Sequence, residues 1–213
     1  MEVGSRYYVA LDLGQAMDFT ALAVLERLVT LGPRDMATYE WRKEVSLRLR
    51  HVERMSLGTS YPAVVERVRG ITGSRELEGR CELVVDGTGV GRPVVDLLRG
   101  ARLGCRILPV TITGGDSESY SDGYHRVPKR DLVTGLQLLV QQDRLQIAAK
   151  MKDAEVLLRE MREMQVRVTD AGREQFGVWR SGSHDDLVLA VALSAWAANR
   201  VLPVLRYGTT PIV

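Results

Sequence analysis

The sequence has few cysteines and no long apolar run. Its 213 residues contain only two cysteines, Cys81 and Cys105, without the paired spacing of a zinc site or the dense pattern of a disulfide scaffold. We therefore expect buried free thiols in a reducing compartment. The N-terminus lacks the hydrophobic region of a signal peptide, and no apolar run is long enough to cross a membrane. These absences predict a cytoplasmic protein with no membrane partner.

Lysine is also scarce, because 25 of the 29 basic residues are arginines. Arginine suits bidentate contacts to phosphate or carboxylate, although a GC-rich genome or a hot habitat explains the same bias equally well. The net charge of +2 does not by itself indicate a nucleic-acid partner. With 45% hydrophobic and 26% charged residues and no linker, the chain reads as one globular domain over residues 1–213.

An apolar stretch with one carboxylate opens the chain. Tyr7–Gly14 is typical of a buried strand, and Asp12 near its end is costly inside apolar surroundings unless something pairs with it. After a short polar turn, Asp18–Leu25 predicts a second strand that returns beside the first. The alternating pattern of Ala37–Arg50 predicts a third strand. Three antiparallel strands are therefore expected first.

Strands and helices alternate in the rest of the chain. We expect helices near 61–73, 94–99, 128–142, 153–163 and 183–198, strands at 81–86, 105–113 and 145–147, a loop at 114–123, and a hairpin over 165–179. The helix that follows Asp186 is apolar on nearly every side, which predicts that it is the most buried one. This order predicts an α/β fold with a mixed sheet and helices on both faces.

Four aspartates are candidate metal ligands. Asp12 and Asp86 each end an apolar strand, and Asp185 and Asp186 precede the buried helix. Because sites in α/β sheets form at the carboxyl ends of strands, these carboxylates can converge. They would then repel one another unless cations lay between them, and Mg²⁺ or Mn²⁺ suits an all-carboxylate set.

Each acidic residue also has a purely structural interpretation. Asp12 and Asp86 could bond their own turns, and Asp185 and Asp186 could simply favour the positive end of a helix. Lys129 at a helix start opposes the helix dipole, so it and Arg130 face carboxylates, a phosphate backbone or only solvent. The glycines at 87, 89 and 91 fit neither the dinucleotide nor the nucleotide-binding loop.

Four short motifs, in this order and spacing, resemble the nuclease domain of a tailed-phage large terminase from about Tyr7 to about Asn199. They are Leu11-Asp12-Leu13-Gly14 followed by Asp18-Phe19-Thr20-Ala21, Val84-Val85-Asp86-Gly87-Thr88-Gly89, Val127-Pro128-Lys129-Arg130-Asp131-Leu132, and His184-Asp185-Asp186-Leu187-Val188-Leu189-Ala190. The resemblance implies a ribonuclease H-like fold and a two-metal endonuclease that cuts double-stranded viral DNA during genome packaging, with little sequence specificity.

By position, the resemblance implies that Asp12 bridges two Mg²⁺ or Mn²⁺ ions, that Asp86 binds one, and that Asp186, or else Asp185, completes the set. The residues expected to contact DNA or support the ligands are Lys129, Arg130, Asp18 and His184. It further implies host cytoplasm as the location, with an ATPase motor domain, a portal and a small terminase as partners. No motor segment is found in the chain.

Three other functions fit parts of the pattern. A Holliday-junction resolvase of the same fold would share the carboxylates. An actin-like or sugar-kinase-type ATP-binding fragment would share the hairpin of Asp12 and Thr20, although such proteins need a second comparable domain. A DNA-docking module, in which the acidic residues are only helix caps, is the non-enzymatic alternative.

Overall fold

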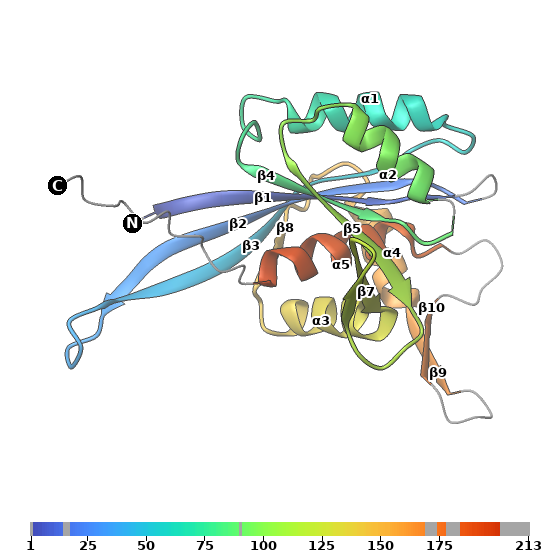
Figure 1. Cartoon of the computed structure of the whole chain (residues 1–213). Coiled ribbons are helices and arrows are strands. Elements are labelled where there is room, and N and C mark those ends of the chain that lie inside the picture. Colours follow the sequence, from blue (N-terminus) through green and yellow to red (C-terminus); the bar gives the residue numbers. More distant parts are fainter. Residues whose placement is uncertain (1, 15–17, 90, 169–173, 178–183, 201–213) are drawn as a thin grey trace.

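Three long antiparallel strands form the first part of the sheet, as the sequence predicts. They are β1 (Glu2–Asp12), β2 (Ala21–Arg34) and β3 (Trp41–Arg54). The computed structural model of the chain describes residues 2–14, 18–89, 91–168, 174–177 and 184–200. β2 and β3 continue past the body of the molecule as a two-stranded ribbon whose turn lies far from the helices (Figure 1). β2 is thus longer than predicted, and β3 has the predicted length but lies four residues further along the chain.

The remaining strands complete an eight-stranded mixed sheet in the order β6-β7-β5-β4-β1-β2-β3-β8. Parallel pairing joins β4 to β1 and β5, β5 to β7, and β3 to β8. The bounds are β4 (Cys81–Asp86), β5 (Arg106–Thr113), β6 (Ser119–Ser121), β7 (Tyr124–Pro128) and β8 (Leu145–Ile147). A separate antiparallel hairpin consists of β9 (Gln165–Val168) and β10 (Glu174–Gly177).

Helices cover both faces of the sheet, which confirms the predicted α/β class (Figure 1). α1 (Tyr61–Thr72) and α2 (Gly91–Gly100) pack on one face, and α3 (Lys129–Gln141), α4 (Ala154–Glu163) and α5 (Asp186–Asn199) pack on the other. Because successive side chains of a strand point to opposite faces, Val9 and Leu11 belong to the first core while Tyr8 and Ala10 belong to the second.

α5 is buried along nearly its whole length. Of its 14 residues only Trp196 and Asn199 are not buried. Apolar side chains on all sides leave no polar face for water, so the helix packs between the sheet and its neighbours α3 and α4. This confirms the prediction that it is the most buried helix, and it fixes the position of the aspartates at its start.

The loop predicted at 114–123 was partly wrong. It contains β6, which pairs antiparallel with β7, and β7 occupies residues expected to lead directly into a helix. The short pattern there is too brief to give a period-2 signal, and pairing with β5 supplies the order. One further boundary moved, since α2 begins at Gly91 rather than near residue 94. In the predicted hairpin, the last residue of each strand, Thr169 and Trp179, lies outside the described residues.

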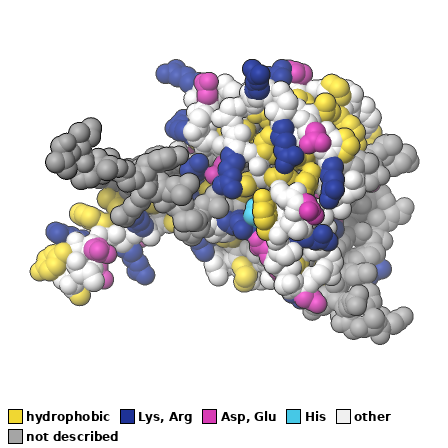
Figure 2. Space-filling model, in the orientation of Figure 1, with side chains coloured by type: hydrophobic (Ala, Val, Ile, Leu, Met, Phe, Trp, Pro, Cys, Tyr) yellow, Lys and Arg dark blue, Asp and Glu magenta, His cyan; other side chains and the backbone are white. Residues whose placement is uncertain are grey.

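Charged side chains of both signs lie on the surface, and the two cysteines are free thiols. Lys and Arg side chains are scattered over the visible face among fewer acidic ones (Figure 2). Both cysteines are free, with Cys81 buried and Cys105 half-buried. Among the described residues, no helix combines the length and the hydrophobicity that a membrane span needs.

Candidate active site

Asp12 and Asp86 lie at the same edge of the sheet on neighbouring parallel strands. Each follows directly after a paired residue, since Leu11 of β1 is opposite Val85 of β4. Both residues are buried, like the apolar strands that they end. Gly14 follows Asp12, and its backbone N–H donates to the Thr20 hydroxyl at 3.2 Å, which closes the turn towards β2. The predicted convergence of these two residues is therefore present.

Asp86 is held by the turn that follows it. Its Oδ1 accepts hydrogen bonds from the backbone N–H of Thr88 at 2.9 Å and from the Thr88 hydroxyl at 2.5 Å. The Thr88 hydroxyl oxygen in turn accepts from the backbone N–H of Ile112 on β5 at 2.9 Å. Thr88, which is anchored to the adjacent strand β5, thus orients this carboxylate, so the turn interpretation and a site role coexist for Asp86.

The aspartate pair stands at the start of α5, and its two members contact different cations. Lys129 Nζ, at the start of α3, lies 2.7 Å from Asp185 Oδ2. Asp186 Oδ2 lies 3.7 Å from Arg54 Nη2 and 3.7 Å from His184 Nδ1. Although it is buried, this Asp186 oxygen has no hydrogen-bond partner among the residues that the structure describes. A buried carboxylate oxygen without a partner is an available ligand for a cation.

Burial and like charges act together on these carboxylates. Burial raises the pKa of Asp12 well above its usual range, and the carboxylate of Asp86 raises it further. The Asp186 and Asp185 carboxylates push the Asp12 pKa in the same direction, and the Lys129 ammonium opposes them. Burial likewise raises the pKa values of Asp86 and Asp186. The edge thus holds more negative charge than its own side chains neutralise.

Of the other predicted residues, His184 and Asp18 lie at or beside the site, whereas Arg130 lies away from the candidate carboxylates. His184 lies at the site, with its ring edge-on to Phe19 at 4.9 Å between centroids. Asp18 is exposed and lines a neighbouring hollow of about 420 Å³ that also includes Gly14 and Thr20. Arg130 does not face the carboxylates, because it pairs with Asp116 and Asp131 on the surface. Its expected DNA-binding or supporting role gains no support from this position.

Three residues at the site were missed by the sequence analysis. They are Thr88, Arg54 at the end of β3, and Glu160 of α4. Thr88 stood in a recognised motif, but no role was assigned to it. Arg54 forms ion pairs with both Glu160 and Asp186. A search for a buried cation near Asp12 could have found Arg54, since it lies two residues after the buried Val52.

The donor set fits a hard divalent cation, although the carboxylates are not gathered around one point. Within the part of the chain that the structure describes, no three His, Cys, Asp or Glu side chains stand as close as metal ligands do. The unpartnered Asp186 oxygen and the like charges around Asp12 are what a bound Mg²⁺ or Mn²⁺ would satisfy. A cation bound here would have to draw the carboxylates together.

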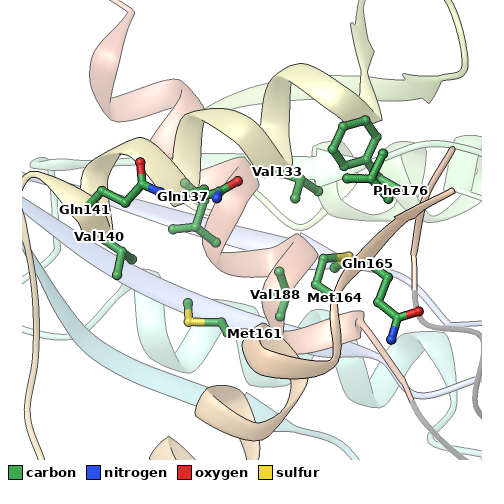
Figure 3. A pocket seen from close by; sticks show the side chains of 11 residues that line it. Val133, Gln137, Val140, Gln141, Met161, Met164, Gln165, Phe176 and Val188 are labelled. Atoms are coloured by element: carbon green, nitrogen blue, oxygen red, sulfur yellow. The ribbon is translucent and has the colours of Figure 1, made fainter. Parts of the chain in front are cut away.

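A second hollow lies elsewhere and contains none of the predicted residues. Its volume is about 310 Å³, and it lies between α3, α4, the β9–β10 hairpin and α5 (Figure 3). Apolar side chains such as Val133, Met161 and Phe176 line most of it, with Gln137 and Gln141 at one wall. Nothing in its chemistry resembles the acidic edge of the sheet.

Solved structures with a similar fold include large terminase nucleases of phages. The large terminase nuclease of thermophilic phage G20c with bound magnesium matches with a TM-score of 0.59 and 22% identity, over 91% of this chain and 82% of that one. The nuclease domain of the large terminase subunit of bacterial virus Sf6 matches with a TM-score of 0.57 and 15% identity, over 89% and 87%. The chain has the fold of a large terminase nuclease domain. This confirms the predicted ribonuclease H-like sheet.

A full-size relative gives the same terminase fold within a longer chain. The large terminase of bacteriophage HK97 matches 92% of this chain but only 40% of its own length, with a TM-score of 0.50 and 15% identity. No protein family model and no curated protein sequence matches the chain. The likeness is thus one of three-dimensional structure.

Proposed function

We propose that this chain is a metal-dependent endonuclease that hydrolyses double-stranded DNA with little sequence specificity during phage genome packaging. The observation that carries the proposal is that Asp186, at the start of α5, lies near Asp12 and Asp86 at the edge of the sheet, with a buried oxygen that accepts no hydrogen bond from the described residues. The terminase nuclease fold supports the substrate class, and the G20c nuclease of that fold is described with bound magnesium.

Each carboxylate has a proposed role. Asp12 would be the central ligand, since the carboxylates of Asp86, Asp186 and Asp185 all raise its pKa. Asp86, oriented by Thr88, would bind one of the metal ions, and Asp186 would complete the set. When bound, Mg²⁺ or Mn²⁺ lowers the pKa of a coordinated water and stabilises the charge on the leaving oxygen.

Lys129 is the cation of this edge that can face a phosphate. Its ammonium is partly exposed and contacts Asp185, so it can keep that carboxylate in place or shift towards the scissile phosphate. Surface arginines would hold the duplex through its backbone, which carries no sequence information. In the complete packaging system we propose an ATPase motor domain, a portal and a small terminase as partners.

The test compares plasmid cleavage by the native chain and by Asp12→Asn, in Mg²⁺ or Mn²⁺ and with EDTA as the metal-free reference. Asp96→Asn is the matched control, because Asp96 is an exposed aspartate of α2 that pairs with Arg99 on the same helix. Loss of cutting in Asp12→Asn alone supports the proposal. Undiminished cutting by that variant would sink it. A strong preference for four-way junctions over linear duplex would instead indicate a resolvase.

A further inference from the structure

The buried start of α5 is capped by a residue from another helix. The first backbone N–H groups of a helix have no partner within it, and Asp185 at the N-cap position forms no side-chain cap. Glu160 Oε2 of α4 instead accepts hydrogen bonds from the N–H groups of Leu187 at 3.1 Å and Val188 at 3.3 Å. The cap thus comes from 27 and 28 residues earlier in the chain, and Glu160 is itself 3% exposed.

One arginine joins this cap to the candidate metal ligand. Arg54 Nη2 binds the other carboxylate oxygen of Glu160, Oε1, and also lies 3.7 Å from Asp186 Oδ2. The guanidinium rests over the Phe19 ring, 4.8 Å from its centroid. Three elements therefore converge on the first turn of α5: the end of β3, the turn before β2, and α4.

We infer that Arg54 and Glu160 are positioning residues that hold Asp186 ready for a metal ion, an inference that rests on the proposed function. Both oxygens of Glu160 are engaged, one by Arg54 and one by the helix N-terminus, so Glu160 is not itself a ligand. Asp186 immediately precedes the capped N–H groups. Its backbone is therefore fixed by Glu160, and its carboxylate is held beside Arg54 without a hydrogen bond that would occupy it.

A positioning role and a simple charge effect predict opposite results for Arg54→Gln. Removing a positive charge near a cation site strengthens cation binding if only charge matters. If Arg54 positions Asp186, the same change weakens binding, because Glu160 and Asp186 lose their common partner. Replacing a residue that orients a metal ligand typically lowers metal affinity by about 10–100-fold. We expect at least about tenfold weaker Mn²⁺ binding.

The experiment is Mn²⁺ titration by calorimetry on the full chain, with far-ultraviolet circular dichroism to establish that each variant is folded. Arg54→Gln and Glu160→Gln are the main variants. Arg54→Lys keeps the charge but loses the planar fork, so it tests the same idea if Arg54→Gln does not fold. Arg67→Gln is the matched control, since it breaks the Arg67–Glu53 pair at 2.7 Å, which involves neither Asp186 nor Glu160.

The outcomes separate the two proposals. Weakened Mn²⁺ binding in Arg54→Gln and Glu160→Gln, intermediate binding in Arg54→Lys and native binding in Arg67→Gln support the positioning role. Equal or tighter binding in folded Arg54→Gln overturns it while leaving the nuclease proposal intact. In the double variant Arg54→Gln with Glu160→Gln, recovery of native affinity would show that only charge balance matters. Absence of Mn²⁺ binding by the native chain overturns both proposals.

Discussion

Lys129 Nζ lies 2.7 Å from Asp185 Oδ2, whereas the neighbouring Asp186 keeps a buried oxygen without a hydrogen-bond partner. Two adjacent aspartates therefore occupy different electrostatic environments at the same helix start. The first is neutralised by a lysine, and the second is held near Arg54 and His184 but remains open to a further cation. This difference is the basis for proposing Asp186 rather than Asp185 as the main ligand, a choice that their adjacency in the sequence left open.

The first prediction concerns that ranking. Asp186→Asn should reduce plasmid cleavage in Mg²⁺ by about a hundredfold or more, because stabilisation by a bound metal is worth several kcal/mol and each 1.4 kcal/mol is a factor of about ten. Asp185→Asn should cost less, about tenfold, since that carboxylate already has a cation. Initial rates for both variants decide it, and a larger loss in Asp185→Asn would reverse the ranking.

The second prediction distinguishes two adjacent cations. Lys129→Gln should lower cleavage by about tenfold, because it removes the ammonium that pairs with Asp185 at the site. Arg130→Gln is the control and should cleave at the native rate, since Arg130 pairs with Asp116 on the surface. Equal losses in the two variants would mean that Lys129 acts only through general surface charge.

The third prediction concerns stability without metal. A carboxyl group whose pKa is raised in the folded state binds more protons there than in the unfolded chain. The protonated Asp12 therefore contributes to the free energy of unfolding fully below about pH 3.8, and this contribution is lost as pH rises through the pKa of the folded state. In EDTA at pH 7, Asp12→Asn should therefore raise Tm by at least about 3 °C, and its Tm should depend less on pH than that of the native chain. Calorimetric scans from pH 5 to pH 8 test this. A native Tm that rises with pH across this range would contradict it.

Mg²⁺ addition supplies the complementary measurement. An ion that binds only the folded state raises Tm, so Mg²⁺ should stabilise the native chain and have little effect on Asp12→Asn. Equal stabilisation of both proteins would place the ion away from Asp12.

The fourth prediction concerns the close backbone approach at Gly14. A Cβ at this position would lie 2.3 Å from the backbone oxygen of Asp18, so Gly14→Ala should force the turn apart, lower Tm and reduce cleavage. Gly135→Ala is the control, because that exposed helix position has no atom within 4 Å of the added methyl group. It should stabilise α3 by roughly 1 kcal/mol and cleave normally. A native Tm for Gly14→Ala would show that the turn can relax.

The fifth prediction concerns salt. Duplex binding through phosphate contacts releases counterions, so the logarithm of the affinity should fall linearly with the logarithm of salt concentration. Fluorescence anisotropy with two unrelated DNA sequences in Ca²⁺ should give similar affinities and similar slopes of log affinity against log salt concentration. A flat salt response, or a clear preference for one sequence, would argue against backbone-based holding.

Much of this architecture follows from short-range pattern. Apolar runs ending in Asp12 and Asp86 predicted two strands, and their parallel pairing followed from the rule that α/β sites gather at carboxyl ends of strands. The start of α5 was located to within a few residues by the change from polar to continuously apolar sequence. The sequence was less informative for β6 and β7, which are ordered by pairing with β5 and with each other.

The supporting residues were harder to predict because they act across the fold. Glu160 reads as one of several charges on α4, and only its spacing from the buried Leu157 places it on the inner face. Its partners lie on β3 and α5, and no local pattern relates Arg54 to Leu187. Contacts over such sequence separations are set by packing, which no short window of sequence contains.

The ribbon formed by β2 and β3 separates the two ends of the molecule. Ala21 and Arg54 pair beside the acidic edge, and the same strands run to Arg34 and Trp41 at the opposite end. At about 3.4 Å per residue, the 14-residue strands span roughly 45 Å. The exposed turn at 35–40 is consequently a natural attachment point: a dye, a surface tether or a purification tag placed there would lie far from the acidic edge of the sheet.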